Sequence, residues 1–209
     1  MNVLGIDEAG RGAVIGPLVI AGVEVEKNAI NKLKDIQVKD SKKLTPNTRE
    51  RLAHQIRDIA SNIYVEIIYP KEIDEWVIKR NLNLLEEHKV KKIISKSNAS
   101  LIIVDSFSAN AFSLKQRLSS SFPTKEFIVE HKADNKYEVV SAASIIAKVT
   151  RDKLVKALAK DIGSGYPSDP ITQKFLKKAL KDEKLKNQVR HSWETVERLK
   201  KGTQKKLFL

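Results

Sequence analysis

The sequence contains no cysteine, which excludes disulfide bonds, thiolate metal sites and cysteine nucleophiles. A catalytic metal would therefore have to bind oxygen ligands or the four histidines. No apolar run approaches the roughly 18 residues that a membrane-spanning helix needs. The N-terminus also lacks the basic and apolar segments of a secretion signal. We therefore expect a soluble, cytoplasmic protein without a membrane partner.

Acidic residues are outnumbered, with 26 Asp and Glu against 39 Lys and Arg, so the net charge is +13. The basic residues are spread along the whole chain, which favours a polyanionic partner. A basic but merely solvated surface is the alternative, because charge alone names no substrate. The length of 209 residues suits one catalytic core with a small extension better than two full-sized domains.

Apolar runs at 2–6 and 17–25 predict two strands joined as a hairpin through a glycine-rich loop. Leu101–Val104 is a continuous apolar run typical of a buried parallel strand. Residues 136–160 predict the longest helix, which should pack deep against the sheet because its residues are small or apolar. The alternation of strands and helices predicts a mixed α/β sheet with helices on both faces. Further strands are expected at 63–69 and 126–129. Helices are expected at 45–59, at 71–97 in two pieces and at 109–119. Residues 170–201 are expected to form two Lys-rich helices with little core of their own.

Carboxylates stand where three of these elements end or begin. Asp7 and Glu8 follow the first strand, Asp105 follows the strand at 101–104, and Asp134 precedes the long helix. If the two strands are neighbours, their carboxyl ends bring Asp7 and Asp105 to one edge of the sheet. Such carboxylates repel one another unless a cation lies between them, and Mg²⁺ or Mn²⁺ prefers oxygen ligands.

Each carboxylate also has a structural interpretation that involves no metal. Asp134 is well placed to cap the following helix, and Asp105 could begin a turn. Asp7 and Glu8 could lie in a solvated loop. Adjacent strand residues point to opposite faces, so Glu8 can join Asp7 only if the strand has ended or bulged there, as Ala9 and Gly10 permit.

The run Asp7-Glu8-Ala9-Gly10-Arg11-Gly12, followed by Gly16-Pro17-Leu18-Val19, closely resembles the opening of type 2 ribonucleases H (ribonuclease HII). The likeness spans nearly the whole chain and looks archaeal. One departure is Ala13, where the family commonly has proline. Further matching runs, in the family's order, are Asp40–Leu44, Val104-Asp105, Lys132–Asp134, Ser141–Asp152, Gly165–Asp169 and Arg190–Trp193.

The resemblance implies a ribonuclease H-like fold, with a mixed five-stranded sheet, flanking helices and a helical C-terminal extension. We place the catalytic core at 1–165 and the extension at 166–209. The resemblance also implies an endonuclease that cuts the RNA strand of RNA/DNA hybrids and cuts at ribonucleotides embedded in duplex DNA. Two ions of Mg²⁺ or Mn²⁺ with bound substrate would give 5'-phosphate and 3'-hydroxyl ends, which suits ribonucleotide excision in DNA replication and repair. The implied metal-binding and catalytic residues are Asp7, Glu8, Asp105 and Asp134, the same four that the element boundaries indicate.

An enzyme that distinguishes RNA from DNA must recognise the 2'-hydroxyl group. The glycines of Gly10-Arg11-Gly12 would let backbone groups approach the minor groove closely. Tyr166 matches the family tyrosine that packs on the sugar beside the cut; its alternative is a loop aromatic that covers a helix end. The resemblance further indicates phosphate contacts by Ser41, Lys42, Lys43, Lys148 and Arg151.

Three residues in the matching runs have no assigned chemistry. His191 and Trp193 are expected to pack the extension onto the core, and Asp152 is expected to pair with a basic neighbour. The C-terminal segment Gln204–Leu209 partly resembles peptides that dock on sliding clamps, although the paired aromatic end is missing.

Two rival interpretations remain. Ribonuclease HIII carries an additional N-terminal domain, whereas this chain enters its first strand at residue 2. A non-catalytic nucleic-acid-binding module would bind without regard to magnesium and would not cut. We expect the enzyme to act as a monomer.

Overall fold

The computed structural model describes residues 1–39, 44–79, 82–159 and 161–205, the side chains of 201–205 excepted. The chain divides into two compact units, both built from separate stretches of sequence. The first unit consists of Met1–Ala9, Val19–Glu66 and Glu86–Val149, and the second of Gly10–Leu18, Ile67–Leu85 and Thr150–Leu209.

A five-stranded mixed sheet has the strand order β3-β2-β1-β4-β5. The central strand β1 pairs antiparallel with β2 and parallel with β4, and β4 pairs parallel with β5. The expected hairpin and mixed sheet are therefore confirmed. The strands are β1 (Asn2–Ala9), β2 (Leu18–Glu26), β3 (Asn62–Ile68), β4 (Leu101–Asp105) and β5 (Glu126–Glu130).

Two strands run further than the apolar pattern predicts. β1 continues through Asp7 and Glu8 to Ala9, and β4 includes Asp105. The pairing of β1 with β2 is regular to the end, with Glu8 opposite Ile20. The expectation that these carboxylates follow the strands is therefore wrong, because backbone pairing continues past the last apolar residue.

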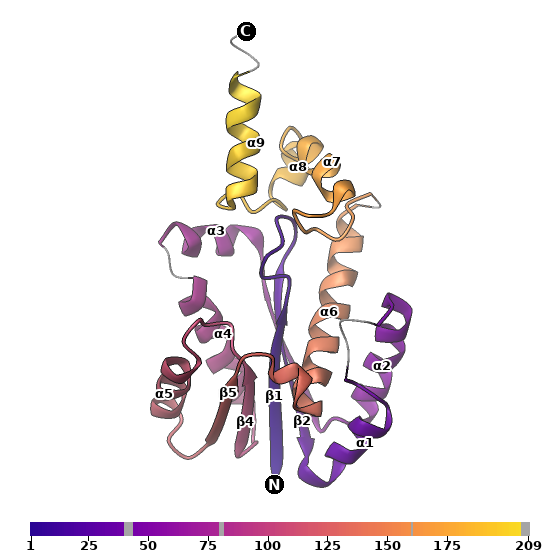
Figure 1. Cartoon of the computed structure of the whole chain (residues 1–209), viewed down its shortest axis with the longest axis vertical. Helices are drawn as coiled ribbons and strands as arrows, with labels where there is room; N and C mark the ends of the chain where they lie inside the picture. Colours follow the sequence, from indigo (N-terminus) through magenta and orange to yellow (C-terminus); the bar gives the residue numbers. More distant parts are fainter. Residues whose placement is uncertain (40–43, 80–81, 160, 206–209) are drawn as a thin grey trace. The chain divides into compact units, whose positions relative to one another are not determined.

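Helices pack on both faces of the sheet, and two glycines mark where they come closest. A Cβ added at Gly5 would lie 2.4 Å from the backbone carbon of Val139 in helix α6 (Glu138–Leu158). A Cβ at Gly22 would lie 2.7 Å from Ile93 of α4 (Leu82–Lys96). Gly5 and Gly22 occupy alternating register positions of the β1–β2 pair, so α6 and α4 lie on opposite faces. Figure 1 shows α4 and α5 to the left of β1, and α1, α2 and α6 to its right.

Among the other helices of the first unit, α2 and α5 agree with predicted helices, whereas η1 and α1 were not predicted. Thr45 caps α2, as its position before a proline predicts, by accepting a hydrogen bond from the Thr48 N–H. The segment before α6 is an unpredicted 3₁₀ helix, η2. These elements are η1 (Lys27–Ala29), α1 (Ile30–Asp35), α2 (Pro46–Ile59), α5 (Ala111–Ser121) and η2 (Ala133–Asn135).

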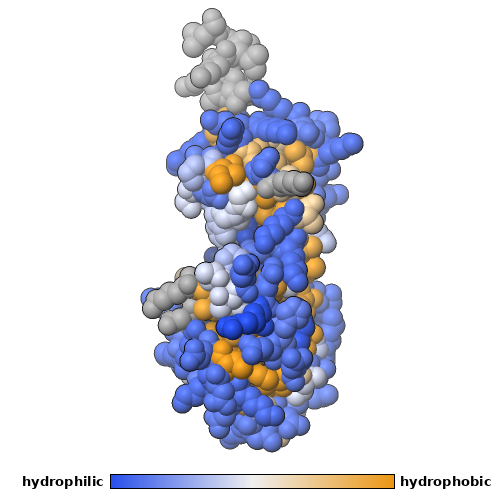
Figure 2. Space-filling model, turned by 90° about the vertical axis from the view of Figure 1, so that its right-hand side faces the viewer, coloured by the Kyte–Doolittle hydropathy of each residue, from blue (hydrophilic) through white to orange (hydrophobic). Residues whose placement is uncertain are grey.

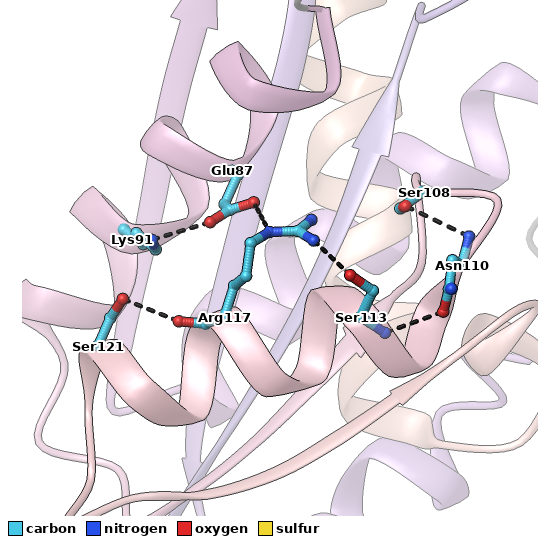
Figure 3. Close-up of polar contacts among 7 residues, drawn as sticks. All are labelled: Glu87, Lys91, Ser108, Asn110, Ser113, Arg117 and Ser121. Atoms are coloured by element: carbon cyan, nitrogen blue, oxygen red, sulfur yellow. Dashed lines mark hydrogen bonds and ion pairs between the residues drawn. The ribbon is translucent and has the colours of Figure 1, made fainter.

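A buried carboxylate joins α4 to α5 (Figure 3). Glu87 of α4 accepts a hydrogen bond from Arg117 Nε of α5 at 2.7 Å, and Lys91 Nζ lies 2.8 Å from its other oxygen. Burial alone would raise the pKa of Glu87, but these two cations outweigh it and the pKa is lowered. The side chain therefore remains charged where α4 meets α5.

The second unit has a hydrophobic core of its own. Val14 and Ile15 of the loop after β1 pack with apolar residues of the C-terminal segment, and Ile15 forms an isolated bridge with Val189. The C-terminal segment supplies only part of this core, because the loop after β1 and the end of α6 contribute side chains distant in sequence. The C-terminal segment also contains three helices instead of the two expected. The helices of this unit include α3 (Pro70–Ile78), α7 (Pro170–Ala179), α8 (Glu183–Lys186) and α9 (Glu194–Lys205). The division at 165/166 remains a prediction, since the compact units group 166–209 with earlier stretches.

Hydrophilic residues predominate on the face shown in Figure 2, and hydrophobic residues form smaller patches there. Exposed large apolar side chains in the described part of the chain include Ile78, Phe112 and Ile171. No helix among the described residues is both long and apolar enough to cross a membrane.

Candidate active site

The central pair of parallel strands brings two of the predicted carboxylates together. Ile6 of β1 lies opposite Val104 of β4, so Asp7 and Asp105 are the next residues on adjacent strands. Asp7 follows Gly5 by two positions and therefore lies on the face that α6 covers. Carboxylate oxygens of Asp7, Asp105 and Asp134 all lie within 4.8 Å of one another.

The third carboxylate is positioned by the tight connection after β5. Lys132 adopts a left-handed backbone conformation with φ of 59°, which turns the chain into η2. The Ala133 N–H then donates to Asp105 Oδ1 at 3.2 Å, and the Ser141 hydroxyl of α6 donates to the Asp134 carbonyl. α6 begins at Glu138, four residues after Asp134. Asp134 is therefore not the cap of the long helix.

Two of the three carboxylates are buried, with Asp7 at 7% and Asp134 at 4% exposure, and Asp105 is half-buried. Burial raises the pKa of Asp7 to about 7, opposed by a hydrogen bond from Ser144. The charges of Asp105 and Asp134 raise it further, whereas the Glu8 N–H, 2.7 Å from Asp7 Oδ1, lowers it. Such a cluster of oxygen donors fits a hard divalent cation, which would offset the repulsion that raises this pKa.

Glu8 is not part of this three-residue group, among the residues that the structure describes. β1 shows no bulge at this point, and neighbouring residues of a regular strand point to opposite faces. Its side chain is half-buried. The role of Glu8 as a fourth ligand stays a prediction.

The predicted Gly10-Arg11-Gly12 loop belongs to the second unit, and its two glycines serve different purposes. Gly10 has φ of +90°, and a Cβ there would lie 2.2 Å from Arg151 Nε, so packing requires glycine. Gly12 is exposed, with no atom within 4 Å of its ideal Cβ position. Arg11 Nη2 donates to Asn83 Oδ1 at 2.6 Å. The open space at Gly12 is compatible with close approach by a ligand.

Arg151 and Tyr166 lie together in the second unit. The Arg151 guanidinium lies 4.8 Å from the centre of the Tyr166 ring and donates to the Ser164 carbonyl at 3.1 Å. Arg151 is only 3% exposed, and its burial lowers its pKa. These contacts indicate that Arg151 supports the loops beneath Gly10 and Tyr166; its predicted phosphate contact remains untested.

The structure says less about the other residues predicted to contact phosphate. Lys148 is a half-buried residue of α6 in the first unit. Ser41, Lys42 and Lys43 lie outside the described residues.

A packing role was expected for His191 and Trp193, but sequence reasoning missed the polar contacts that Arg190 and Ser192 make in the same run. Asp74 of α3 accepts hydrogen bonds from the backbone N–H groups of His191 and Ser192, both at 2.9 Å, and from the Ser192 hydroxyl. Arg190 is fully buried and donates to carbonyls of the loop after β1. The family-like motif was visible in the sequence, but its contacts depend on tertiary structure.

The sequence profile of the family described as Ribonuclease HII matches residues 4–196. The chain belongs to the ribonuclease HII family. It is therefore a metal-dependent endoribonuclease, and ribonuclease HII cleaves the RNA strand of RNA/DNA hybrids. A ribonuclease HII from Methanothermobacter thermautotrophicus is 45% identical over 96% of this chain and 100% of its own length.

Solved structures agree with this assignment and with the predicted ribonuclease H-like fold. The crystal structure of ribonuclease H2 from Pyrococcus horikoshii has a TM-score of 0.87 and 42% identity, covering 98% of this chain and 100% of that one. The ribonuclease HII in a complex with PCNA from Archaeoglobus fulgidus has a TM-score of 0.85 and 39% identity, covering 93% of this chain and 94% of that one.

Proposed function

We propose that this ribonuclease HII cuts at single ribonucleotides embedded in duplex DNA as well as in continuous hybrids, and leaves 5'-phosphate and 3'-hydroxyl ends. The observation that carries the catalytic part is the approach of three carboxylates, from β1, β4 and η2, to within 4.8 Å. These elements are distant in sequence, and the fold collects their acidic groups in a protein of net charge +13.

Asp7, Asp105 and Asp134 would hold Mg²⁺ or Mn²⁺, with two ions when substrate is bound, and Glu8 would be the fourth ligand. Bound metal would activate the attacking water and stabilise the leaving oxygen at phosphorus. Ser144 and the Glu8 N–H orient Asp7 through their hydrogen bonds, and the Ala133 N–H orients Asp105. No serine or histidine nucleophile is required.

Recognition of the ribonucleotide would depend on the Gly10-Arg11-Gly12 loop, with Tyr166 packing on the adjacent sugar. The exposed, unobstructed position of Gly12 supports this role, because a backbone donor there can approach a 2'-hydroxyl closely. Phosphate contacts are assigned to Ser41, Lys42, Lys43, Lys148 and Arg151.

The deciding experiment uses a DNA duplex with one ribonucleotide, the same duplex without it, and a continuous hybrid. Incubation with Mg²⁺ or Mn²⁺ should cut the first and third duplexes only, and chelation should stop cutting. Mapping the products should give 5'-phosphate and 3'-hydroxyl ends. Cutting of the continuous hybrid alone would contradict the proposed action on single ribonucleotides.

The metal-ligand assignment is tested by Asp7→Asn, which should abolish cutting while leaving most duplex binding intact. Asp58→Asn, an exposed residue of α2, is the matched control and should retain activity. Retained activity in Asp7→Asn would remove Asp7 from the mechanism. Glu8→Gln tests the fourth ligand separately.

A sliding clamp is the proposed protein partner, docked through Gln204–Leu209. The relative from Archaeoglobus fulgidus is described in a complex with PCNA, which supports this choice. Residues 206–209 lie outside the described part of the chain. A pull-down on immobilised clamp, with and without residues 203–209, tests the contact, and equal capture would exclude the tail. Light scattering of the free protein tests the expected monomer.

A further inference from the structure

Arg190 holds the loop after β1 at three points, all within the second unit. Its backbone N–H donates to the Val14 carbonyl at 2.9 Å. Its guanidinium donates through Nε to the Gly16 carbonyl at 3.0 Å and through Nη1 to the Arg11 carbonyl at 2.9 Å. One buried residue therefore fixes the loop at Arg11, Val14 and Gly16.

The burial of Arg190 is complete, and a buried guanidinium is costly unless its donors are satisfied. The Trp193 ring lies 5.0 Å from the guanidinium carbon, a cation–π arrangement that leaves the edge of the guanidinium available to the carbonyls. Packing alone would be served by an apolar side chain. Two charge-assisted hydrogen bonds to backbone carbonyls instead fix the orientation of particular peptide groups.

The peptide group between Arg11 and Gly12 is the one whose orientation matters for a ligand. The structure contains no cis peptide bond among its described residues. In a trans peptide the C=O and the following N–H point in opposite directions. Because the Arg11 carbonyl points at Arg190, the Gly12 N–H points away from it, at a glycine that is exposed and has open space around its ideal Cβ position.

We propose that Arg190 is a positioning residue that directs the Gly12 N–H toward the 2'-hydroxyl oxygen of the ribonucleotide. This inference rests on the proposed role of the Gly10-Arg11-Gly12 loop. Arg190 does not touch the substrate; it acts through the Arg11 peptide group. Its loss reduces the preference for ribonucleotides and leaves backbone binding of DNA unchanged.

The first test compares wild type, Arg190→Lys and Arg190→Met at a temperature where circular dichroism shows each protein folded. Cutting of the single-ribonucleotide duplex gives kcat/KM, and competition by the all-DNA duplex gives an inhibition constant. For Arg190→Met we expect kcat/KM to fall about 100-fold, with the inhibition constant unchanged within about twofold. Arg190→Lys keeps the charge and one donor, so it should recover part of the loss.

The matched control is Arg198→Met, which removes an exposed arginine of α9 that pairs only with Glu194 in the contacts described. It should behave like wild type in both measurements. If Arg190→Met instead lost kcat/KM and DNA competition equally, a general structural role would be indicated and the proposal would be overturned. If wild type itself does not distinguish the two duplexes, the proposed function fails. If wild type distinguishes them and the Arg190 variants do so equally well, this inference alone fails.

The second test does not depend on activity, and its first comparison uses wild type alone. The chain has eight glycines, so selective ¹⁵N-glycine labelling gives a simple amide spectrum. In metal-free buffer, the ribonucleotide-containing duplex should shift the wild-type Gly12 signal more than the all-DNA duplex does. The difference should disappear in Arg190→Met and should be reduced in Arg190→Lys. An identical Gly12 response to both duplexes in wild type would overturn the proposal.

Discussion

Asp7 combines near-complete burial with two neighbouring carboxylates, and both factors raise its pKa to about 7. In metal-free protein the folded state therefore holds a proton more tightly than the unfolded state, whose aspartate has its ordinary value of 3.8. The folded state loses stability from this group as pH rises from about 4 to about 7, and the loss is constant above that range. An acidic site built for a cation is a source of instability without one.

Asp7→Asn should therefore stabilise the metal-free protein at pH 8, on the order of 1 to 4 kcal/mol, because it removes the buried charge. The stability difference from wild type should be near zero at pH 4, grow toward pH 7 and then level off. Denaturant unfolding in the presence of a chelator, repeated between pH 4 and pH 9, measures this difference.

Adding Mg²⁺ at pH 8 should make the wild type more stable than Asp7→Asn. Only the wild type keeps all three carboxylates, so only it gains the full metal-binding energy. Asp58→Asn should show neither effect. A pH-independent difference between wild type and Asp7→Asn would mean that Asp7 titrates normally in the folded protein.

The position of α6 over β1 depends on the absence of a side chain at Gly5. A Cβ there would lie 2.4 Å from the Val139 carbon and 2.5 Å from its oxygen, and backbone atoms cannot swing away as a side-chain end can. The same helix carries Ser141, which bonds the Asp134 carbonyl, and Ser144, which bonds Asp7. Close packing of helix on strand is therefore part of the site's construction.

Gly5→Ala should consequently destabilise the protein by about 1 to 3 kcal/mol through overpacking, and should also lower activity by displacing α6. Gly12→Ala is the matched control for stability, because the added methyl group meets open space. Its melting temperature should stay close to that of wild type, although its cutting of ribonucleotides should fall. Thermal unfolding followed by circular dichroism measures both. Equal stability of Gly5→Ala and wild type would show that α6 does not pack as closely as described.

At the level of the whole molecule, the second unit depends on residues from distant parts of the chain. Its hydrophobic core unites the loop after β1 with segments on both sides of the predicted 165/166 boundary. A cut at 165 would remove one part of this core and leave the other part facing solvent. The residues left would be Val14, Ile15, Val155 and Ile162, and those removed would include Phe175, Leu176, Ala179, Val189 and Val196.

A protein consisting of 1–165 should therefore unfold at a lower denaturant concentration than the full chain and should bind a hydrophobic dye. A chain ending at residue 202 keeps every member of this core and should match the full chain in stability. Denaturant unfolding and dye fluorescence compare the three proteins. Full stability of 1–165 would support the sequence-based boundary and contradict the importance of the shared core.

The sequence by itself determined the family and the mixed sheet, because its motifs and its apolar runs are local signals. It also named the three carboxylates that cluster, together with Glu8, which does not belong to that group among the described residues. The three-residue group could be predicted since parallel neighbouring strands place Asp7 and Asp105 at corresponding positions. The boundaries of the strands were less predictable. Backbone hydrogen bonding carries β1 through Asp7 and Glu8, and side-chain polarity does not reveal that.

Only the tertiary structure decided which residues support the site and the loop. Arg190 and Arg151 lie in family-like runs of the sequence, and the resemblance indicated a phosphate contact for Arg151 but no bracing role for either residue. Their burial follows from how distant segments pack, since carbonyls of the loop after β1 and two aromatic rings surround them. Whether a cation faces solvent or braces a loop depends on contacts between residues far apart in the chain, and no local pattern contains that information.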